Sequence, residues 1–335
     1  MKGKLLFLIA VLAVVFSAFN CGSGETARWE RVPLEEARVL VVHSYDMSFS
    51  WTAMVHSGMT YVLEQEGIEY EEYFMDTKRN PSEEYKQESG QAALELVEEY
   101  EPHVVLTSDD NAQGYFASLL NNSDTAVVFC GVNGTPEAYE YDTADNVTGI
   151  LERPKIKSSL SLLARVVPEF QSLSLVMDES TTSAALLDYF NSLDIPYQVD
   201  DVLRTNSFTE WQEFVQGVES DALFTYTYNT ITEDGERVEP SSIIEWTINA
   251  RTDLPTVGVL DFGVQDGLLI GNVESGFEHG EMAARMGIDI LNGRAPSEMP
   301  ITIAEQGLIC VNQSTADILG VDVSGLLNIT DVVFE

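Results

Sequence analysis

The chain has 335 residues, of which 44% are hydrophobic and 10% aromatic, which excludes an intrinsically disordered chain. Its length suits two domains of roughly 150 residues after removal of an export signal. The formal net charge of −38 argues against nucleic acid and anionic lipid headgroups as partners, because both would repel so acidic a protein.

The first 21 residues have the pattern of an export signal. Lys2 and Lys4 give a positive start, and the apolar run over residues 5–16 is too short to span a membrane comfortably. Cys21-Gly-Ser-Gly-Glu resembles the start of a mature bacterial lipoprotein, which implies a lipid anchor on Cys21. An ordinary cleaved signal that contains a cysteine is the alternative. Under either interpretation the chain is extracytoplasmic, periplasmic or at the cell surface, and residues 22–36 form a linker.

Short apolar runs alternate with longer amphipathic stretches over the next part of the chain. Strands are expected at residues 38–43, 69–75, 103–107, 126–130 and 147–150, and helices at 50–65, 81–100 and 111–120. The strands are continuously apolar rather than alternating. They therefore predict a parallel sheet covered by helices on both faces.

The same order restarts after residue 150. Helices are expected at residues 156–167, 182–193, 208–218 and 241–249, strands at 172–177, 197–202, 222–228 and 256–260, and a polar hairpin or loop at 230–239. Two consecutive α/β units predict two similar lobes. Ligands of such sheets bind at the carboxyl ends of the strands, so we expect the site in a cleft between the lobes.

Charge and rare residues give further expectations. Acidic residues recur on the predicted helices while lysine is scarce, which favours a source in high salt, where self-repulsion is screened. An acidic extracytoplasmic protein from an ordinary habitat is the alternative. Cys130 and Cys310 lie in apolar runs and are expected to be buried, with a disulfide between them left open. The four histidines lack paired ligand spacing, so neither a metal site nor a cofactor is predicted.

Six segments, in this order and spacing, carry a resemblance to a known family. They are His43-Ser-Tyr-Asp-Met-Ser-Phe-Ser-Trp51, Met75-Asp-Thr-Lys-Arg79, Phe129-Cys-Gly-Val-Asn133, Asn146-Val-Thr-Gly149, Gly276-Phe-Glu-His-Gly-Glu-Met-Ala-Ala284 and Val311-Asn-Gln-Ser-Thr-Ala-Asp-Ile-Leu-Gly320. Together they resemble the extracytoplasmic substrate-binding proteins of ABC transporters, in the branch of tryptophan- and tyrosine-type binders. The first two also resemble ligand-sensing domains of bacterial signalling proteins.

The resemblance implies an α/β fold of the type I periplasmic-binding kind. Two doubly wound parallel-sheet lobes would be joined by a hinge with three crossovers. Lobe one would hold residues 37–148 and 269–296, and lobe two residues 149–268 and 297–335. Several connections at a hinge allow the lobes to close around a ligand without separating.

Candidate ligand-binding residues follow the strands of lobe one. Tyr45, Phe49 and Trp51 could stack on a flat or apolar ligand, although Trp51 could instead pack beneath the first helix. Asp109 and Asp110 could hold the ammonium group of an amino-acid-like ligand, or could cap the helix that follows.

Further candidates lie at other strand ends. Asp76 could contact ligand or form a local ion pair, and Asn133 could offer its amide or support a turn. Tyr226 and Tyr228 would face the same side of a strand by its period of two, and could close over the ligand. Asp261 ends the next strand and is a similar candidate.

Ser180 and Thr181 precede a predicted helix of lobe two. Their hydroxyl groups and the free N–H groups there could receive a ligand carboxylate. Capping of the helix explains the same residues equally well. Two acidic residues close by make this helix end less suited to an anion.

These observations favour a binding protein. The leading hypothesis is a monomeric solute-binding lipoprotein that captures a small molecule and delivers it to an ABC transporter permease. The relatives' preference points to an aromatic or branched amino acid as the ligand. The alternative is a sensory subunit that presents the ligand to a membrane receptor or kinase. The sequence carries none of the common catalytic motifs, so we do not expect an enzyme.

Overall fold

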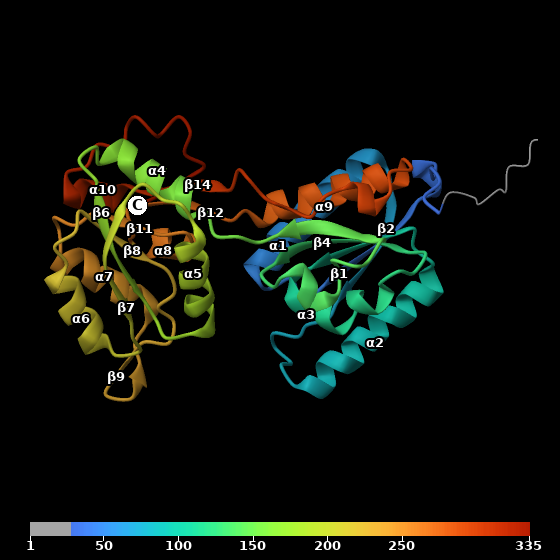
Figure 1. The fold of residues 1–335 in the computed structure, drawn as a ribbon, viewed down its shortest axis with the longest axis horizontal. Helices are drawn as coiled ribbons and strands as arrows, with labels where there is room; N and C mark the ends of the chain where they lie inside the picture. Colours follow the sequence, from blue (N-terminus) through green and yellow to red (C-terminus); the bar gives the residue numbers. More distant parts are fainter. Residues whose placement is uncertain (1–27) are drawn as a thin grey trace, which may run out of the picture.

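Two β-sheets, each covered by helices on both faces, form the two lobes of the molecule (Figure 1). The computed structural model describes residues 28–335. The expected export signal and Cys21 lie outside this range. Within it, no helix combines the length and apolarity needed to cross a membrane.

Lobe one contains a six-stranded sheet in which every neighbouring pair is parallel. Its strands, in spatial order, are β13 (Thr302–Ile303), β5 (Val147–Leu151), β4 (Ala126–Val132), β3 (Val104–Ser108), β1 (Arg38–His43) and β2 (Glu69–Phe74). Helices α1 (Ser50–Glu66) and α9 (Gly276–Leu291) cover one face, and α2 (Glu83–Tyr100) and α3 (Asp109–Tyr115) cover the other. The central strands are buried on both faces, as their continuous apolar runs predict.

Lobe two contains a seven-stranded sheet that is parallel apart from the antiparallel pair of β12 and β14. Its strands, in spatial order, are β15 (Val332–Phe334), β14 (Leu308–Asn312), β12 (Ile270–Val273), β11 (Thr256–Val257), β8 (Ala222–Thr225), β6 (Ser172–Met177) and β7 (Gln198–Arg204). Helices α4 (Ile156–Val166), α5 (Thr181–Ser192) and α10 (Gln313–Leu319) pack on one face. Helices α6 (Phe208–Gly217), α7 (Pro240–Ala250) and α8 (Asp261–Asp266) lie on the other side. Strands β9 (Thr232–Glu233) and β10 (Glu236–Arg237) form the expected hairpin.

The chain crosses between the lobes three times, after β5, after β12 and after β13, which confirms the expected fold. The crossings lie elsewhere than expected. Strand β5 belongs wholly to lobe one, so the first crossing follows residue 151 rather than 148. Strand β12 lies in lobe two and β13 in lobe one, so segment 269–296 does not lie wholly in lobe one nor 297–335 wholly in lobe two. Short apolar runs just before a crossing complete the sheet they leave, which shifts each boundary by a few residues.

Part of the expected linker is folded structure. Trp29, Val32 and Leu34 pack against the core of lobe one, and the Val32 N–H donates to the Leu291 carbonyl at 2.8 Å. Residues 28–36 are therefore an extension of lobe one. The apolar side chains within an otherwise polar stretch explain the difference.

Three other expected elements also differ. The helix expected at 111–120 starts two residues earlier and breaks at Phe116, and a 3₁₀ helix follows over Ala117–Leu120. The strand expected at 222–228 ends at Thr225, and the one expected at 256–260 ends at Val257. Cys130 and Cys310 are both buried and free, in strands of different lobes.

Salt should stabilise the folded chain. The excess of acidic side chains gives a net charge of −38, and these side chains repel one another in the folded state. Molar NaCl weakens this repulsion because it shortens the electrostatic screening length to about 3 Å. We expect the melting temperature to rise by several degrees between 0.1 and 2 M NaCl, since each kcal/mol moves it by roughly 2–4 °C. Differential scanning calorimetry measures the rise, with molar sucrose as a control for excluded-solute effects. A melting temperature that stays flat in NaCl would contradict salt adaptation.

Candidate binding cleft

Two adjoining cavities open between the lobes. Their volumes are about 670 and 460 Å³, and they share the side chains of Asn133 and Glu152 from lobe one and Asn229, Leu260 and Phe262 from lobe two. We call the two cavities together the cleft. Each cavity alone falls within the usual size range of small-molecule sites.

Strand ends place the cleft residues. In lobe one they lie at or after the carboxyl ends of β1, β2, β3, β4 and β5, and in lobe two at or after those of β6, β8, β11 and β12. The parallel strands within each sheet bring these ends to one edge. The strand-end rule therefore located the cleft correctly.

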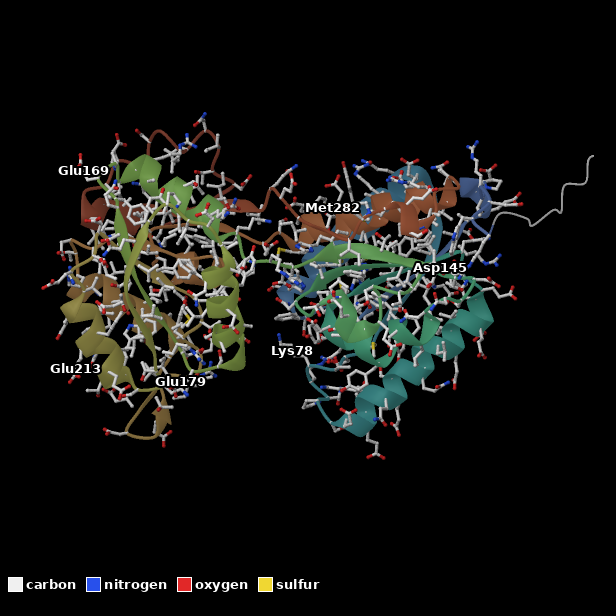
Figure 2. All side chains as sticks on the ribbon, viewed as in Figure 1. Lys78, Asp145, Glu169, Glu179, Glu213 and Met282 are labelled. Atoms are coloured by element: carbon white, nitrogen blue, oxygen red, sulfur yellow. The ribbon has the colours of Figure 1, made fainter. Side chains whose placement is uncertain are left out.

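The loop after β1 supplies aromatic rings. Tyr45 and Phe49 stand edge to face with centroids 5.5 Å apart, and both border the smaller cavity. The Lys78 ammonium lies 3.2 Å from the Phe49 ring centroid and 5.1 Å from that of Tyr45. Figure 2 labels Lys78 at the edge of lobe one that faces lobe two. Burial lowers the pKa of Lys78, although Asp109 acts in the opposite direction. These rings thus already accept a cation.

Trp51 lies between the cleft and the packed interior of lobe one. It borders the cleft, and its ring also packs against Gly131 and stands 5.4 Å, edge on, from His279. Gly131 has φ +65°, and a Cβ there would come within 3.3 Å of the indole. Among the described residues, the buried Nε1 of Trp51 has no hydrogen-bond partner of good geometry, although the indole helps to lower the pKa of Asp109.

Asp109 is the most deeply buried carboxyl group of the cleft. It is only 5% exposed, and its backbone has φ 64°, a region that L-residues seldom adopt. Asp109 does not cap α3, because Ser108 is the N-cap residue of that helix. The Ser108 side chain makes no capping hydrogen bond. The Ser108 hydroxyl instead donates to Asp109 Oδ2 at 3.0 Å. Burial raises the pKa of Asp109 to about 7, with a smaller contribution from Asp110.

Asp110 also borders the cleft, but it organises the loop after β4. Its carboxylate accepts the backbone N–H of Asn133 at 3.1 Å and of Gly134 at 2.8 Å, and the Tyr139 hydroxyl at 2.6 Å. Asn133 borders the cleft, and its Nδ2 donates to Glu152 Oε2 at 3.1 Å.

Glu152 and Arg153 were not predicted, although both follow β5 directly. Burial, followed by the nearby Asp109 and Glu274, raises the pKa of Glu152 to about 8. Arg153 donates to four backbone carbonyl groups, those of residues 132, 133, 134 and 152, at 2.6–3.2 Å. The strand-end rule would have found both residues if this strand had been extended by one residue, to Leu151.

Tyr226 and Tyr228 do not face the same side, contrary to the expectation. Tyr226 borders the cleft, whereas Tyr228 is fully buried behind the sheet and donates to Asp266 at 2.7 Å. Strand β8 ends at Thr225, so the alternation of side chains between the two faces of a strand does not extend to Tyr226 and Tyr228. Asp261 borders the cleft, but it begins α8 instead of ending a strand, and accepts the N–H of Phe262 at 2.8 Å.

The remaining candidates have local partners. Asp76 pairs with Arg79 at 2.7 Å and borders neither cavity. Ser180 caps α5 by accepting the N–H of Ser183 at 3.1 Å, and Thr181 is the first residue of that helix. The cleft residues that α5 supplies, which sequence reasoning missed, are Thr182, Ala185, Leu186 and Tyr189.

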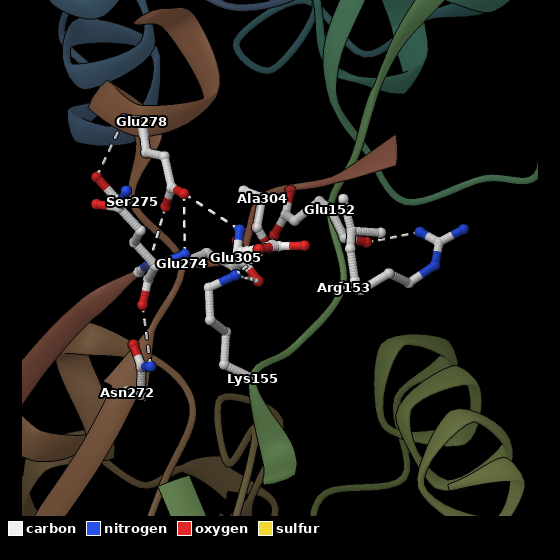
Figure 3. A network of polar contacts seen from close by, with 12 residues as sticks. Glu152, Arg153, Lys155, Asn272, Glu274, Ser275, Glu278, Ala304 and Glu305 are labelled. Carbon is white, nitrogen blue, oxygen red and sulfur yellow. Dashed lines mark hydrogen bonds and ion pairs between the residues drawn. The ribbon is translucent and has the colours of Figure 1, made fainter. Parts of the chain in front are cut away.

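One polar network joins all three crossings (Figure 3). Lys155 on the first crossing forms an ion pair with Glu274 on the second at 3.3 Å, and donates to the Ala304 carbonyl on the third at 2.6 Å. Glu274 also contacts His279 Nε2 at 2.9 Å. The Glu278 carboxylate accepts the backbone N–H groups of residues 305–307 at 2.8–3.1 Å. This hinge network is buried at the Lys155–Glu274 pair, whose side chains are 5% and 7% exposed.

Solved structures of several binding proteins share this fold. A ligand-free, open substrate binding protein with adhesive properties from Clostridium difficile superposes with a TM-score of 0.71 at 16% identity, covering 89% of this chain and 100% of that one. An ABC domain from Streptococcus pneumonia in complex with L-Trp gives a TM-score of 0.55 at 15% identity, covering 89% and 99%. A periplasmic ribose ABC transporter protein from Conexibacter woesei gives 0.51 at 10% identity, covering 86% and 97%.

The family itself is established by sequence. No curated protein matches the chain significantly. The model of the family described as ABC transporter substrate binding protein, however, matches residues 52–330, which is most of the chain and spans both lobes. The chain therefore belongs to the ABC transporter substrate binding protein family.

Proposed function

We propose that this chain is an extracytoplasmic solute-binding protein that captures an aromatic or branched amino acid in the cleft and delivers it to an ABC permease. Lipidation at Cys21 would hold it at the membrane as a monomer. The observation that supports the proposal most is the cleft itself, where aromatic rings and buried carboxyl groups converge from both lobes. Ligand would favour the closed state by binding it more tightly than the open one.

A ligand screen tests the proposal. The chain from Gly22 onward would be heated in molar salt with amino acids, nucleobases and small peptides, because a ligand of the native state raises the melting temperature by mass action. Small-angle scattering on the same samples would report closure as a fall in the radius of gyration. Absence of both effects with every class would contradict capture in the cleft.

Loss of the Phe49 ring should weaken binding. Phe49→Ala removes one wall of the smaller cavity, and we expect an affinity loss of about tenfold, since a buried aromatic contact exceeds 1 kcal/mol. Isothermal titration calorimetry measures the change. Tyr61→Ala is the matched control, because Tyr61 is an exposed aromatic residue of α1 that borders neither cavity. Equal losses in both variants would place the ligand elsewhere.

A further inference from the structure

A chain of polar contacts leads from the cleft to the outer face of lobe one. Ser108 Oγ lies 3.0 Å from Asp109 Oδ2 and 2.8 Å from His43 Nδ1. His43 Nε2 lies 3.2 Å from His56 Nδ1, and His56 Nε2 lies 3.4 Å from Glu72 Oε2. Ser108, Asp109 and His43 are buried, whereas the Glu72 side chain is 46% exposed. We call these five residues the relay.

The sheet register builds the relay. His43 and Ser108 are the last residues of β1 and β3 and stand opposite each other in the parallel pair. Glu72 lies on β2 at the other side of β1, and His56 comes from α1, which covers this face. His43 also stacks on Phe74 with centroids 5.1 Å apart. Two histidines 13 residues apart are thus brought into contact although their sequence spacing suggests no site.

The relay has two hydrogen-bond arrangements, which run in opposite directions. When Asp109 is protonated, each donor can point outward: the Asp109 carboxyl to Ser108, Ser108 to His43 Nδ1, His43 Nε2–H to His56, and His56 Nε2–H to the Glu72 carboxylate. When Asp109 is ionised, the donors point inward: His56 Nδ1–H to His43, His43 Nδ1–H to Ser108, and Ser108 to Asp109. The second arrangement holds one proton fewer, which is lost from His56 Nε2 at the outer end.

The charges around the relay make both arrangements accessible near neutral pH. Burial, and then His56, lower the pKa of His43 to about 3, so its ring stays neutral. Burial also lowers the pKa of His56 against the opposing effect of Glu72 and Glu64. The pKa of Asp109 is about 7, as described above. The titratable groups that face Asp109 from other elements are Lys78, Asp110, Glu152, Tyr45 and Cys130.

The cleft offers carboxyl groups to a ligand rather than basic groups. Asp109, Glu152, Asp261 and Glu274 all border the smaller cavity. The Arg153 guanidinium is committed to backbone carbonyls, and Lys78 is the one other basic side chain among the described residues that border either cavity. A cation that enters the smaller cavity would meet the buried Asp109 carboxylate beside the aromatic pair that Lys78 already contacts, and a carboxylate binds an organic ammonium group by a charge-assisted hydrogen bond.

We propose that the cleft takes a ligand with an organic ammonium group beside a flat apolar body, and that this cation replaces the proton on Asp109 while the relay reverses its hydrogen bonds. The proposal rests on the proposed solute-binding function and adds the charge of the ligand and the proton exchange. One positive charge enters and one proton leaves, so the site keeps its net charge. Ser108, His43 and His56 are positioning residues for Asp109.

Matched probes test the charge of the ligand. Tryptamine, the neutral tryptophol and the anionic indole-3-propionate share one ring system. We expect tryptamine to bind at least about tenfold more tightly than tryptophol, and the anion to bind least. Below pH 7 the Kd of tryptamine should weaken by up to tenfold per pH unit, and it should level off above pH 7.

Proton release is measured in the same titrations. At pH 6, calorimetry in phosphate and in a buffer of high ionisation enthalpy should give close to one proton released per tryptamine. Asp109→Asn should abolish this release and the pH dependence near 7. Persistence of both in the variant would assign the proton to another group, such as Glu152, and overturn the proposal.

The relay has its own readout. Nitrogen-15 NMR of labelled histidine distinguishes Nδ1–H from Nε2–H, and tryptamine should convert His43 from the Nε2–H to the Nδ1–H form at pH 6. Ser108→Ala should raise the midpoint of the pH dependence, because ionised Asp109 loses a donor. Thr107→Val is the control, since the Thr107 hydroxyl contacts Gln113 instead. Unchanged tautomers on binding would overturn the relay.

The outcomes separate this proposal from the function on which it rests. If tryptophol or indole-3-propionate binds as tightly as tryptamine and the scattering reports closure, capture in the cleft stands and the cation proposal fails. If no probe binds and no amino acid, nucleobase or peptide closes the lobes, both fail.

Discussion

Glu274→Ala is expected to lower the melting temperature by roughly 10 °C. The substitution leaves the buried Lys155 ammonium without its counter-charge and His279 Nε2 without its acceptor. Removing one partner of a buried ion pair costs about 3–5 kcal/mol, because the other charge stays desolvated. Each kcal/mol corresponds to roughly 2–4 °C for domains of this size. Differential scanning calorimetry of the ligand-free protein measures the loss.

Two controls identify the cause of that loss. The double variant Lys155→Met with Glu274→Leu removes both charges and keeps apolar volume, so it should recover much of the stability. Glu281→Ala breaks an exposed pair with Arg285 and should cost less than about 1 kcal/mol. If the double variant were no more stable than Glu274→Ala, the unpaired charge would not be the reason.

The hinge network also concerns function. Lys155, Glu274 and Ala304 lie on three different crossings, so the network fixes the crossings relative to one another. Glu274 borders the cleft as well. A ligand cation that attracts this carboxylate would act on the same group that holds the hinge, which connects binding to the geometry of the crossings.

Much of the fold could be predicted from the sequence, because strand type and order depend on local apolar runs. The central strands of both lobes, such as β1 and β6, lie where their continuous hydrophobic residues place them. Short strands at the crossings could not be assigned this way. β13 has two residues, and only its pairing with β5 decides which lobe it joins.

The position of the cleft could be predicted from the sequence, but only some of the residues that line it could. Asp109 and Tyr226 border the cleft because strand ends meet there. Tyr228 lies on the other side of the sheet, because β8 ends before it and the alternation of strand side chains no longer applies. The contact of His43 with His56 depends on how α1 lies over β1. No local pattern contains that information, since it is set by tertiary packing.

Gly280→Ala and Gly58→Ala are also expected to destabilise the folded protein strongly. Helices α1 and α9 approach so closely that a Cβ on Gly280 would overlap the Val55 carbonyl oxygen, and one on Gly58 would overlap that of Phe277. Both obstacles are backbone atoms of a neighbouring helix, so no side chain can rotate away. The helices would have to separate, at a cost of about 3 kcal/mol or more in the free energy of unfolding.

The backbone clash and the helix propensity of alanine predict changes of opposite sign in the free energy of unfolding, so the measurement distinguishes them. Alanine is the better helix former by about 1 kcal/mol, so propensity alone predicts stabilisation in both variants. Gly217→Ala, at the end of α6 with no neighbour within 4 Å of the added carbon, is the matched control and should be neutral or slightly stabilising. Stabilisation of Gly280→Ala in urea denaturation would contradict the close approach of the helices.

The same helix pair links the hinge to the cleft. Helix α9 begins just beyond Glu274, and a Cβ on Gly276 would meet the Trp51 carbonyl oxygen at 3.1 Å. Separating the helices would therefore move Trp51, one of the walls of the cleft. We expect Gly276→Ala to weaken ligand binding as well as stability, whereas Gly217→Ala should leave the affinity unchanged. The glycines of this interface thus hold the cleft wall at a fixed position relative to the crossings.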